Sequence, residues 1–220
     1  MKNIIFMSEF LGLLFPRLCH ACGRALFVHE PAVCSTCIHQ LPRTKFHLDP
    51  ESNADQIFWG RTRIEKASAC FYYTRNSKVQ KMIHDLKYRG HKKIGITIGE
   101  LYGKDLKFSR FYRDINMIIP VPLHPGKKRK RGFNQSELIA RGLSSALDKP
   151  VNTGILYRRA ASQTQTRKSR YSRWKNVEGI FVVKSPKQLE NKHILLVDDV
   201  ITTGSTIESC ANALHLSLIH

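Results

Sequence analysis

Apolar positions along the chain alternate between helical spacing and the continuous runs that are typical of buried strands. Helical spacing predicts helices over residues 77–88 and 94–106, and a third helix that begins at Asn134. Short apolar runs predict strands at residues 67–73, 117–121, 151–156, 179–183 and 193–198. Strands that alternate with helices in this way predict an α/β fold with a mainly parallel sheet.

Two carboxylates and a turn rich in hydroxyls follow the last predicted strand. The carboxylates are Asp198 and Asp199, and the turn consists of Thr202, Thr203, Gly204, Ser205 and Thr206. Helical spacing resumes at Ile207, so the order is strand, turn and helix. Ligands of open α/β sheets bind where strands end, and the N-terminus of a helix attracts anions. The turn therefore predicts a phosphate site and the carboxylates a ribose site, with a buried strand that merely ends in a charged turn as the alternative.

This segment resembles the 5-phosphoribosyl-1-pyrophosphate (PRPP) motif of type I phosphoribosyltransferases. The resemblance implies that Asp198 and Asp199 are catalytic, since they hold the ribose hydroxyls near the positive charge that develops on the sugar. It also implies that residues 202–206 cradle the 5-phosphate, and that Mg²⁺ bridges pyrophosphate and ribose oxygens. The loop after the 117–121 strand, with Leu123 and His124, is placed to meet the pyrophosphate. His124 is a candidate general base, although a hydrogen bond within its own loop is the preferred interpretation.

Residues 158–176 form a long polar and basic stretch without an apolar period. Loops of this length in a compact domain are usually lids or binding loops. We expect a hood that closes over the site and excludes water, with candidate contacts from Gln163, Arg167 and Arg173.

Four cysteines near the N-terminus form two C-x-x-C pairs, Cys19 with Cys22 and Cys34 with Cys37. Two such pairs can close a tetrahedral Zn²⁺ site with no open position, so we predict structural zinc. Disulfides are the alternative. They are disfavoured by the cytoplasmic location that we expect, since no apolar run reaches the ~20 residues of a membrane span. Substitute ligands near the pairs are His20, His29 and His39.

The chain of 220 residues is strongly basic, with 36 Lys and Arg against 17 Asp and Glu and a formal net charge of +19. Residues 120–180 alone carry a net +11. Such an excess favours polyanionic partners, with a generic basic surface as the alternative. Aromatic residues lie within this region and suit base stacking. The candidate nucleic-acid residues are Lys127, Lys128, Arg129, Lys130, Arg131 and Phe133.

Several further segments, in order along nearly the whole chain, resemble the ComF family. They are Phe15-Pro16 before the first cysteine pair, Lys87-Tyr88-Arg89-Gly90, Pro120-Val121-Pro122-Leu123-His124, Arg131-Gly132-Phe133-Asn134-Gln135, Ser162-Gln163, and the run from Arg173 to Phe181. The resemblance implies a zinc ribbon at residues 1–42, a linker at 43–65, and a type I phosphoribosyltransferase domain at 66–220. It also implies a role in the uptake or processing of transforming DNA. The family's fold usually adds a strand after the last helix, whereas this sequence ends at His220.

Three functions remain open at this point. The first is an enzyme that transfers a phosphoribosyl group from PRPP with Mg²⁺. The second is a protein that binds single-stranded DNA and keeps a vestigial or sensory PRPP pocket. The third is a scaffold for a helicase of the competence or uptake machinery, contacted through the zinc ribbon. One basic loop can serve pyrophosphate or DNA, so the sequence does not separate these functions.

Overall fold

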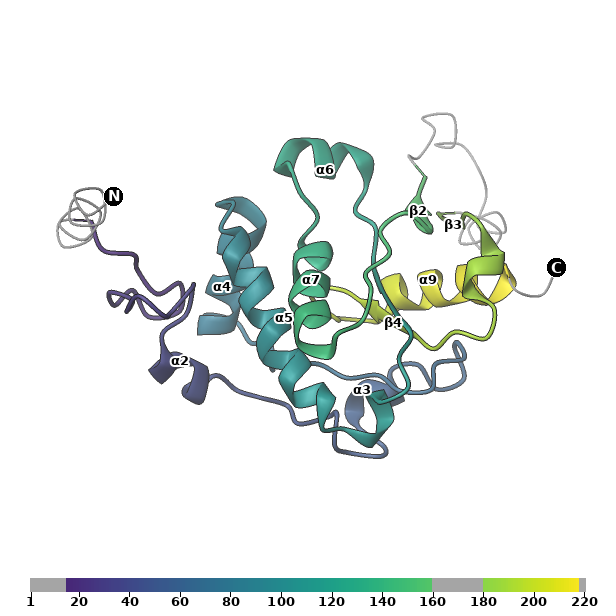
Figure 1. The fold of residues 1–220 in the computed structure, drawn as a ribbon, viewed down its shortest axis with the longest axis horizontal. Helices are drawn as coiled ribbons and strands as arrows, with labels where there is room; N and C mark the ends of the chain where they lie inside the picture. Colours follow the sequence, from purple (N-terminus) through teal and green to yellow (C-terminus); the bar gives the residue numbers. More distant parts are fainter. Residues whose placement is uncertain (1–14, 160–179, 218–220) are drawn as a thin grey trace.

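The computed structural model describes residues 15–159 and 180–217, and helices surround a small sheet in it (Figure 1). The predicted hood residues Gln163, Arg167 and Arg173 lie outside these ranges. In chain order the elements are α2 (Ser35–Gln40), α3 (Asn53–Gln56), α4 (Lys78–Tyr88), α5 (Lys92–Lys107), a 3₁₀ turn (Arg110–Tyr112), β1 (Met117–Pro120), α6 (Pro125–Arg131), α7 (Gln135–Leu147), β2 (Leu156–Arg158), β3 (Phe181–Val183), a 3₁₀ turn (Pro186–Leu189), β4 (Ile194–Val197) and α9 (Ser205–Leu216).

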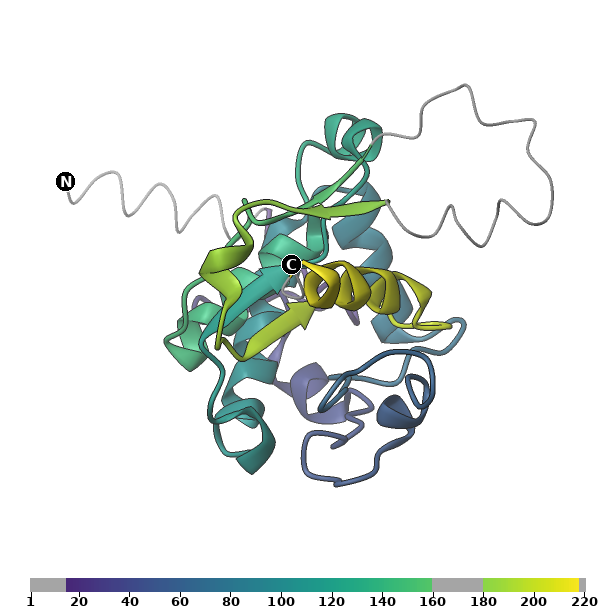
Figure 2. The ribbon, with the colours of Figure 1, turned by 90° about the vertical axis from the view of Figure 1, so that its right-hand side faces the viewer.

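The central sheet pairs β1 with β4 in parallel, from Met117 opposite Ile194 to Pro120 opposite Val197. The two arrows run in the same direction in Figure 2. Val151 adds a single parallel bridge on the other side of β1. A separate antiparallel pair joins β2 to β3. The prediction of an α/β fold with parallel strands is thus confirmed at this level.

Both faces of the central sheet are covered, which explains why its strands are apolar throughout. Ile118 on β1 and Val197 on β4 pack with α7 and the end of α5. Their neighbours Ile119 and Leu196 point to the opposite face, where they pack with Ile207 of α9 and its surroundings. Side chains alternate between the faces of a strand, so two covered faces require continuous apolar runs.

Helices α5 and α7 approach so closely that glycines must line their contact. A Cβ added at Gly99 of α5 would lie 2.1 Å from the Ile139 carbonyl oxygen, and one at Gly142 of α7 would lie 2.1 Å from that of Ile96. The glycines that weaken the helical propensity of residues 94–106 are therefore the residues that let the two backbones meet.

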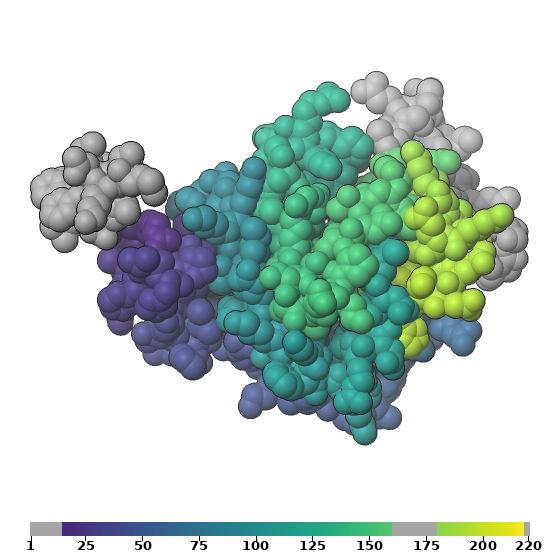
Figure 3. All heavy atoms as spheres, viewed as in Figure 1, coloured from purple at the N-terminus to yellow at the C-terminus, as the bar shows by residue number. Residues whose placement is uncertain are grey.

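The cysteine module, residues 15–42, shares its hydrophobic core with the helices beside it. Val33 and Leu41 of the module pack with Met82 and Leu86 of α4 and Ile94 of α5 in one buried cluster. Figure 3 shows the module as the purple end of the molecule, directly against α4. Residues 43–65 likewise contain a helix, α3, and contribute Phe58 to the core under α9.

Two strand predictions differ from the structure. Residues 67–73 form no regular strand, because their pairing is limited to one antiparallel bridge between Phe71 and Arg43. The strand predicted at 151–156 is divided into the single bridge at Val151 and strand β2, which begins at Leu156. Both segments have the composition of strands, but outside β2 each pairs with a neighbouring segment at only one isolated bridge. The helices predicted at 77–88, at 94–106 and after Asn134 are confirmed as α4, α5 and α7.

Within the described ranges, no helix has the length and apolar character needed to span a membrane.

The contact of α5 with α7 predicts that Gly99→Ala destabilises the protein by about 2–3 kcal/mol, since the methyl group would force the two backbones apart. Urea unfolding would measure this change. Gly126→Ala in the exposed helix α6 is the control, because the added Cβ would meet only the His124 ring, at 3.3 Å. The control should stay within about 1 kcal/mol of the parent protein. An equal urea midpoint for Gly99→Ala and the parent would contradict the packing described.

Candidate functional site

Two loops leave the central sheet at the same edge, because β1 and β4 are parallel neighbours. Val121 continues from β1 and donates its backbone N–H to the carbonyl oxygen of Val197, at 2.8 Å. Residues 121–124 and the Asp198–Asp199 pair therefore emerge side by side. The structure thus brings together two of the segments that the sequence assigns to PRPP.

Asp198 is held by hydrogen bonds at the start of α7. Its Oδ1 accepts from Ser136 Oγ at 3.0 Å and from the Asp199 backbone N–H at 2.8 Å. Asn134 fixes Ser136 in place, because its amide donates to the Val121 carbonyl oxygen at 2.9 Å while its Oδ1 caps α7. Burial raises the pKa of Asp198 to about 6, and the adjacent Asp199 carboxylate adds to this effect.

Asp199 forms an ion pair with Lys87 at the end of α4, with Nζ and Oδ2 2.9 Å apart. Both side chains are largely buried, so the pair is less screened than a surface contact. A cation at this position offsets part of the negative charge of the two adjacent carboxylates. Lys87 also supplies an ammonium group to the edge where an anionic ligand would bind.

Residues 57–61 pack against the hydroxyl turn and hydrogen bond to it. Gly204 has φ +75°, and a Cβ there would lie 2.6 Å from Ile57 Cγ2 and 2.8 Å from Phe58 Cε1. Arg61 donates to the Thr203 carbonyl oxygen at 2.7 Å and pairs with Glu208 on the first turn of α9. The position therefore requires glycine, both for its left-handed backbone and for lack of space.

The side chains of the turn itself remain accessible. Thr202, Thr203 and Ser205 are exposed, and Thr206 is half-buried. Thr203 Oγ1 and Ser205 Oγ lie 3.1 Å apart, within hydrogen-bond distance. As the N-cap of α9, Gly204 offers no capping side chain, so the first backbone N–H groups of this helix remain open to an anion.

His124 caps the helix that follows it. Its Nδ1 accepts from the Gly126 backbone N–H at 3.1 Å, and Pro125 occupies the first helical position. The hydrogen bond that the sequence favours for this histidine is therefore present. A cavity of about 200 Å³ lies beside the loop and is lined in part by Leu123, Lys128 and Tyr157. The hydroxyl turn does not line this cavity.

The basic run that the sequence places in a loop is instead helix α6, which ends at the left-handed Gly132. The His124 cap and the proline explain this helix, since they outweigh repulsion among its charges. None of its residues is buried. Phe133 is a correction to the predicted nucleic-acid surface: it is only 9% exposed and packs in the core, so its ring is closed to base stacking.

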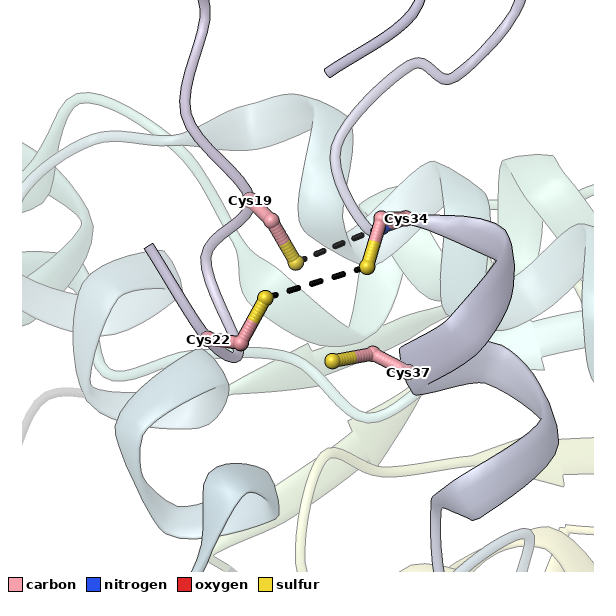
Figure 4. Close-up of side chains that lie close together, drawn as sticks. All are labelled: Cys19, Cys22, Cys34 and Cys37. Atoms are coloured by element: carbon pink, nitrogen blue, oxygen red, sulfur yellow. Dashed lines mark hydrogen bonds between the residues drawn. The ribbon is translucent and has the colours of Figure 1, made fainter. Parts of the chain in front are cut away.

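The four cysteines of the C-x-x-C pairs converge on one point (Figure 4). Their sulfur atoms all lie within 4.8 Å of one another. The Cys34 backbone N–H donates to Cys19 Sγ at 3.3 Å. Burial raises the pKa of the Cys19 thiol, but this and other backbone N–H contacts outweigh it and lower the pKa overall. The chain turns after Cys22 at Gly23, which has the left-handed φ of +81° that glycine adopts readily.

Relatives of the chain are competence and DNA-utilization proteins. The chain is 32% identical over 213 residues to the DNA utilization protein YhgH of Escherichia coli O157:H7, which covers 92% of each protein. The chain belongs to the ComF family. Other members are Competence protein ComFC of Bacillus subtilis, 29% identical over 87% of this chain and 82% of the relative, and Competence protein F of Haemophilus influenzae, 38% identical over 44% and 43%. No family profile and no solved structure matches the chain.

Three residues near the site of this ComF chain have no role in the sequence prediction. Lys87 belongs to the Lys87-Tyr88-Arg89-Gly90 segment that resembles the ComF family, and this resemblance is the sequence signal that could have pointed to it. Ser136 follows a recognisable helix cap, but only the fold places it against Asp198. Arg61 lies in a stretch without any period, so no sequence signal marks it as a support for the turn.

The raised pKa of Asp198 predicts a stability that depends on pH. The folded protein takes up a proton at Asp198 near pH 6, whereas the unfolded chain does so only near pH 4. This contribution to stability is therefore full below pH 4 and is lost as the pH rises through 6. Asp198→Asn should raise the free energy of unfolding by about 2–3 kcal/mol at pH 7.5 and have little effect at pH 4.

Denaturant unfolding at the two pH values measures this difference in stability. The substitution removes only the charge, because the Asn side chain can still accept both hydrogen bonds through Oδ1. Asp114→Asn, which removes an exposed carboxylate, is the matched control. The same difference in both variants would mean that burial does not raise the pKa of Asp198.

Proposed function

We propose that this ComF chain binds PRPP at the edge where β1 and β4 end, as a phosphoribosyltransferase-like protein. The observation that carries the proposal is the order of groups on one edge. An acidic pair ends a parallel strand, and an accessible hydroxyl turn then leads into a helix N-terminus. Parallel sheets bind ligands at this edge, and phosphates bind at helix N-termini.

The proposed roles follow from the charge of each group. The turn from Thr202 to Thr206 binds the 5-phosphate through its hydroxyls and the first N–H groups of α9. Asp198 and Asp199 accept hydrogen bonds from the ribose hydroxyls. Lys87 joins the site as a cation that can turn from Asp199 to the pyrophosphate. Mg²⁺ enters with PRPP, bound through substrate oxygens and water, as this ion prefers.

The reaction that such a site supports is phosphoribosyl transfer, in which the bond between ribose C1 and pyrophosphate breaks and C1 forms a bond to a nucleophilic acceptor. Positive charge then develops on the sugar, where the two carboxylates stabilise it. Negative charge grows on the leaving pyrophosphate, where Lys87 and the loop with Leu123 and His124 lie. The proposed class of enzyme is therefore a glycosyltransferase that acts on PRPP.

We also propose that the four cysteines hold a structural zinc ion. Four convergent thiols match the ligand set and number of a closed zinc site. All six cysteines of the chain are free, which agrees with the reducing cytoplasm that we propose as its location. The ion would stabilise the cysteine module, residues 15–42, against α4.

Calorimetric titration with PRPP and Mg²⁺ tests the main proposal. Thr203→Ala should weaken binding about tenfold, because it removes one hydrogen bond to a charged phosphate. Asp199→Asn should weaken it similarly. Ser209→Ala is the matched control, since this hydroxyl lies one turn farther along α9 and bonds to the Ser205 carbonyl oxygen. Absence of PRPP binding, or equal affinities in all variants, would refute the assignment.

A second function is favoured by the exposure of α6, namely binding of single-stranded DNA. Five consecutive cations, Lys127 to Arg131, occupy a helix without a buried residue, and it projects at the top of the molecule in Figure 3. The names of the relatives, which refer to competence and DNA utilization, support this proposal. A helicase or another part of the uptake machinery would then be a partner on the same DNA.

Replacing Lys127, Lys128, Arg129 and Lys130 with Gln should weaken oligonucleotide binding. It should also lower the slope of log affinity against log salt by about 0.7 for each DNA phosphate that these side chains neutralise in the parent protein. Arg131 is retained because its guanidinium lies 5.2 Å from the centre of the Tyr88 ring. The control carries the same change in charge on another face, at the exposed residues Lys104, Lys107, Arg110 and Arg113. Fluorescence anisotropy of a labelled oligonucleotide at several salt concentrations measures the affinity of each variant. Equal slopes of log affinity against log salt in the two variants would exclude α6 as the DNA surface.

A further inference from the structure

A second group of metal-ligating side chains lies where the cysteine module meets the corner between α4 and α5. His20, Asp85 and His91 present one ligand atom each, and these atoms lie within 4.8 Å of one another. The group borders a hollow of about 660 Å³ in the surface. None of these three residues belongs to the PRPP edge or to the four thiols.

Three separate parts of the fold bring these residues together. His20 directly follows Cys19, and its backbone N–H donates to the Ala32 carbonyl oxygen at 3.1 Å. Asp85 is on the last turn of α4. The chain then reverses at Gly90, with φ +73°, which returns His91 over that turn as the residue before α5. The tertiary fold therefore fixes the backbone of all three.

The geometry of the side chains suits a shared cation. His20 Nδ1 lies 3.5 Å from Asp85 Oδ2, and the His20 and His91 rings are 4.2 Å apart between centroids. Donor atoms around a tetrahedral zinc ion are separated by about 3.4 Å. The three ligand atoms, all within 4.8 Å of one another, are therefore close to the separation that a shared ion requires.

Burial of Asp85 explains why a cation would be stabilising at this group. The Asp85 side chain is only 4% exposed, and a buried carboxylate is unfavourable unless a cation is close to it. Two other basic side chains lie near the Asp85 carboxylate, Arg89 at 3.4 Å and His84 at 3.8 Å. These side chains are 63% and 57% exposed to solvent. A metal ion held at the buried side would compensate Asp85 more directly than these two side chains.

We propose that His20, Asp85 and His91 form a second metal site, which binds one divalent transition-metal ion of the zinc class. Two imidazoles and one carboxylate suit zinc, cobalt or iron better than Mg²⁺ or Ca²⁺, which prefer oxygen ligands. Three protein ligands leave a coordination position open toward the hollow. Five cationic side chains line the hollow, namely Arg17, Lys81, Arg89, Lys92 and Lys93. An anionic oxygen would therefore complete the coordination and offset their repulsion of the ion.

Cobalt titration of the full chain, as isolated with zinc on its cysteines, tests this site. The protein should take up about one Co²⁺ per chain while it keeps its zinc, as measured by elemental analysis after gel filtration. The absorption of the bound cobalt should lack the sulfur-to-metal charge-transfer band, because the site contains no thiolate. His91→Ala should weaken cobalt binding about 100-fold and leave the zinc content unchanged.

The control is His84→Ala, which removes the exposed histidine next to Asp85 and should bind cobalt like the parent protein. Asp85→Asn is a second test of the ligand set. His91 is exposed, so His91→Ala keeps the experiment valid if the buried aspartate variant fails to fold. The proposal is overturned if the zinc-loaded chain binds no cobalt, which would leave the group as an ion pair only. It is also overturned if His91→Ala binds cobalt unchanged, or if cobalt merely displaces zinc and gives the sulfur band.

Discussion

The parallel pairing of β1 with β4 is the constraint on which the rest of the structure depends. Parallel neighbours end at one edge, so the loop after Pro120 and the loop after Val197 emerge together. Helices cover both faces of this sheet and so form three layers, with α7 and α5 on one face and α9 on the other. The glycine contact at Gly99 and Gly142 lets α5 pack closely on α7, and Lys87 of α4 reaches the same edge of the sheet.

Buried carboxylates are the recurring electrostatic feature of the chain. Asp198 lies next to Asp199, which pairs with Lys87, and burial raises the pKa of Asp198, which favours its protonated form. Asp85 is buried among two histidines and an arginine at the corner between α4 and α5. In a chain with a net charge of +19, a buried acid whose charge is only partly offset is a place where a cation or a polar ligand lowers the free energy.

The cysteine module and the helices α4 and α5 form one hydrophobic unit. Met82 and Leu86 pack with Val33 and Leu41, so stability of the module depends on α4 as well as on any bound metal. His20 and Asp85 lie at the same junction. The end of the molecule that carries the four cysteines therefore packs on the helix that carries Lys87, which reaches the proposed PRPP edge.

The sequence by itself determined the elements whose signals are local. Periodicity and caps located α4, α5 and α7, and the apolar run before Asp198 located β4 with its hydroxyl turn. The spacing of the cysteines likewise predicted that four thiols would converge. Tertiary structure alone decided the pairings. It limited residues 67–73 to one bridge and buried Phe133. It also placed Ser136 and Lys87 against the Asp198–Asp199 pair, and Arg61 against the hydroxyl turn. The physical reason is that caps and periods depend on neighbours along the chain, whereas burial and ion pairs depend on segments that meet only after folding.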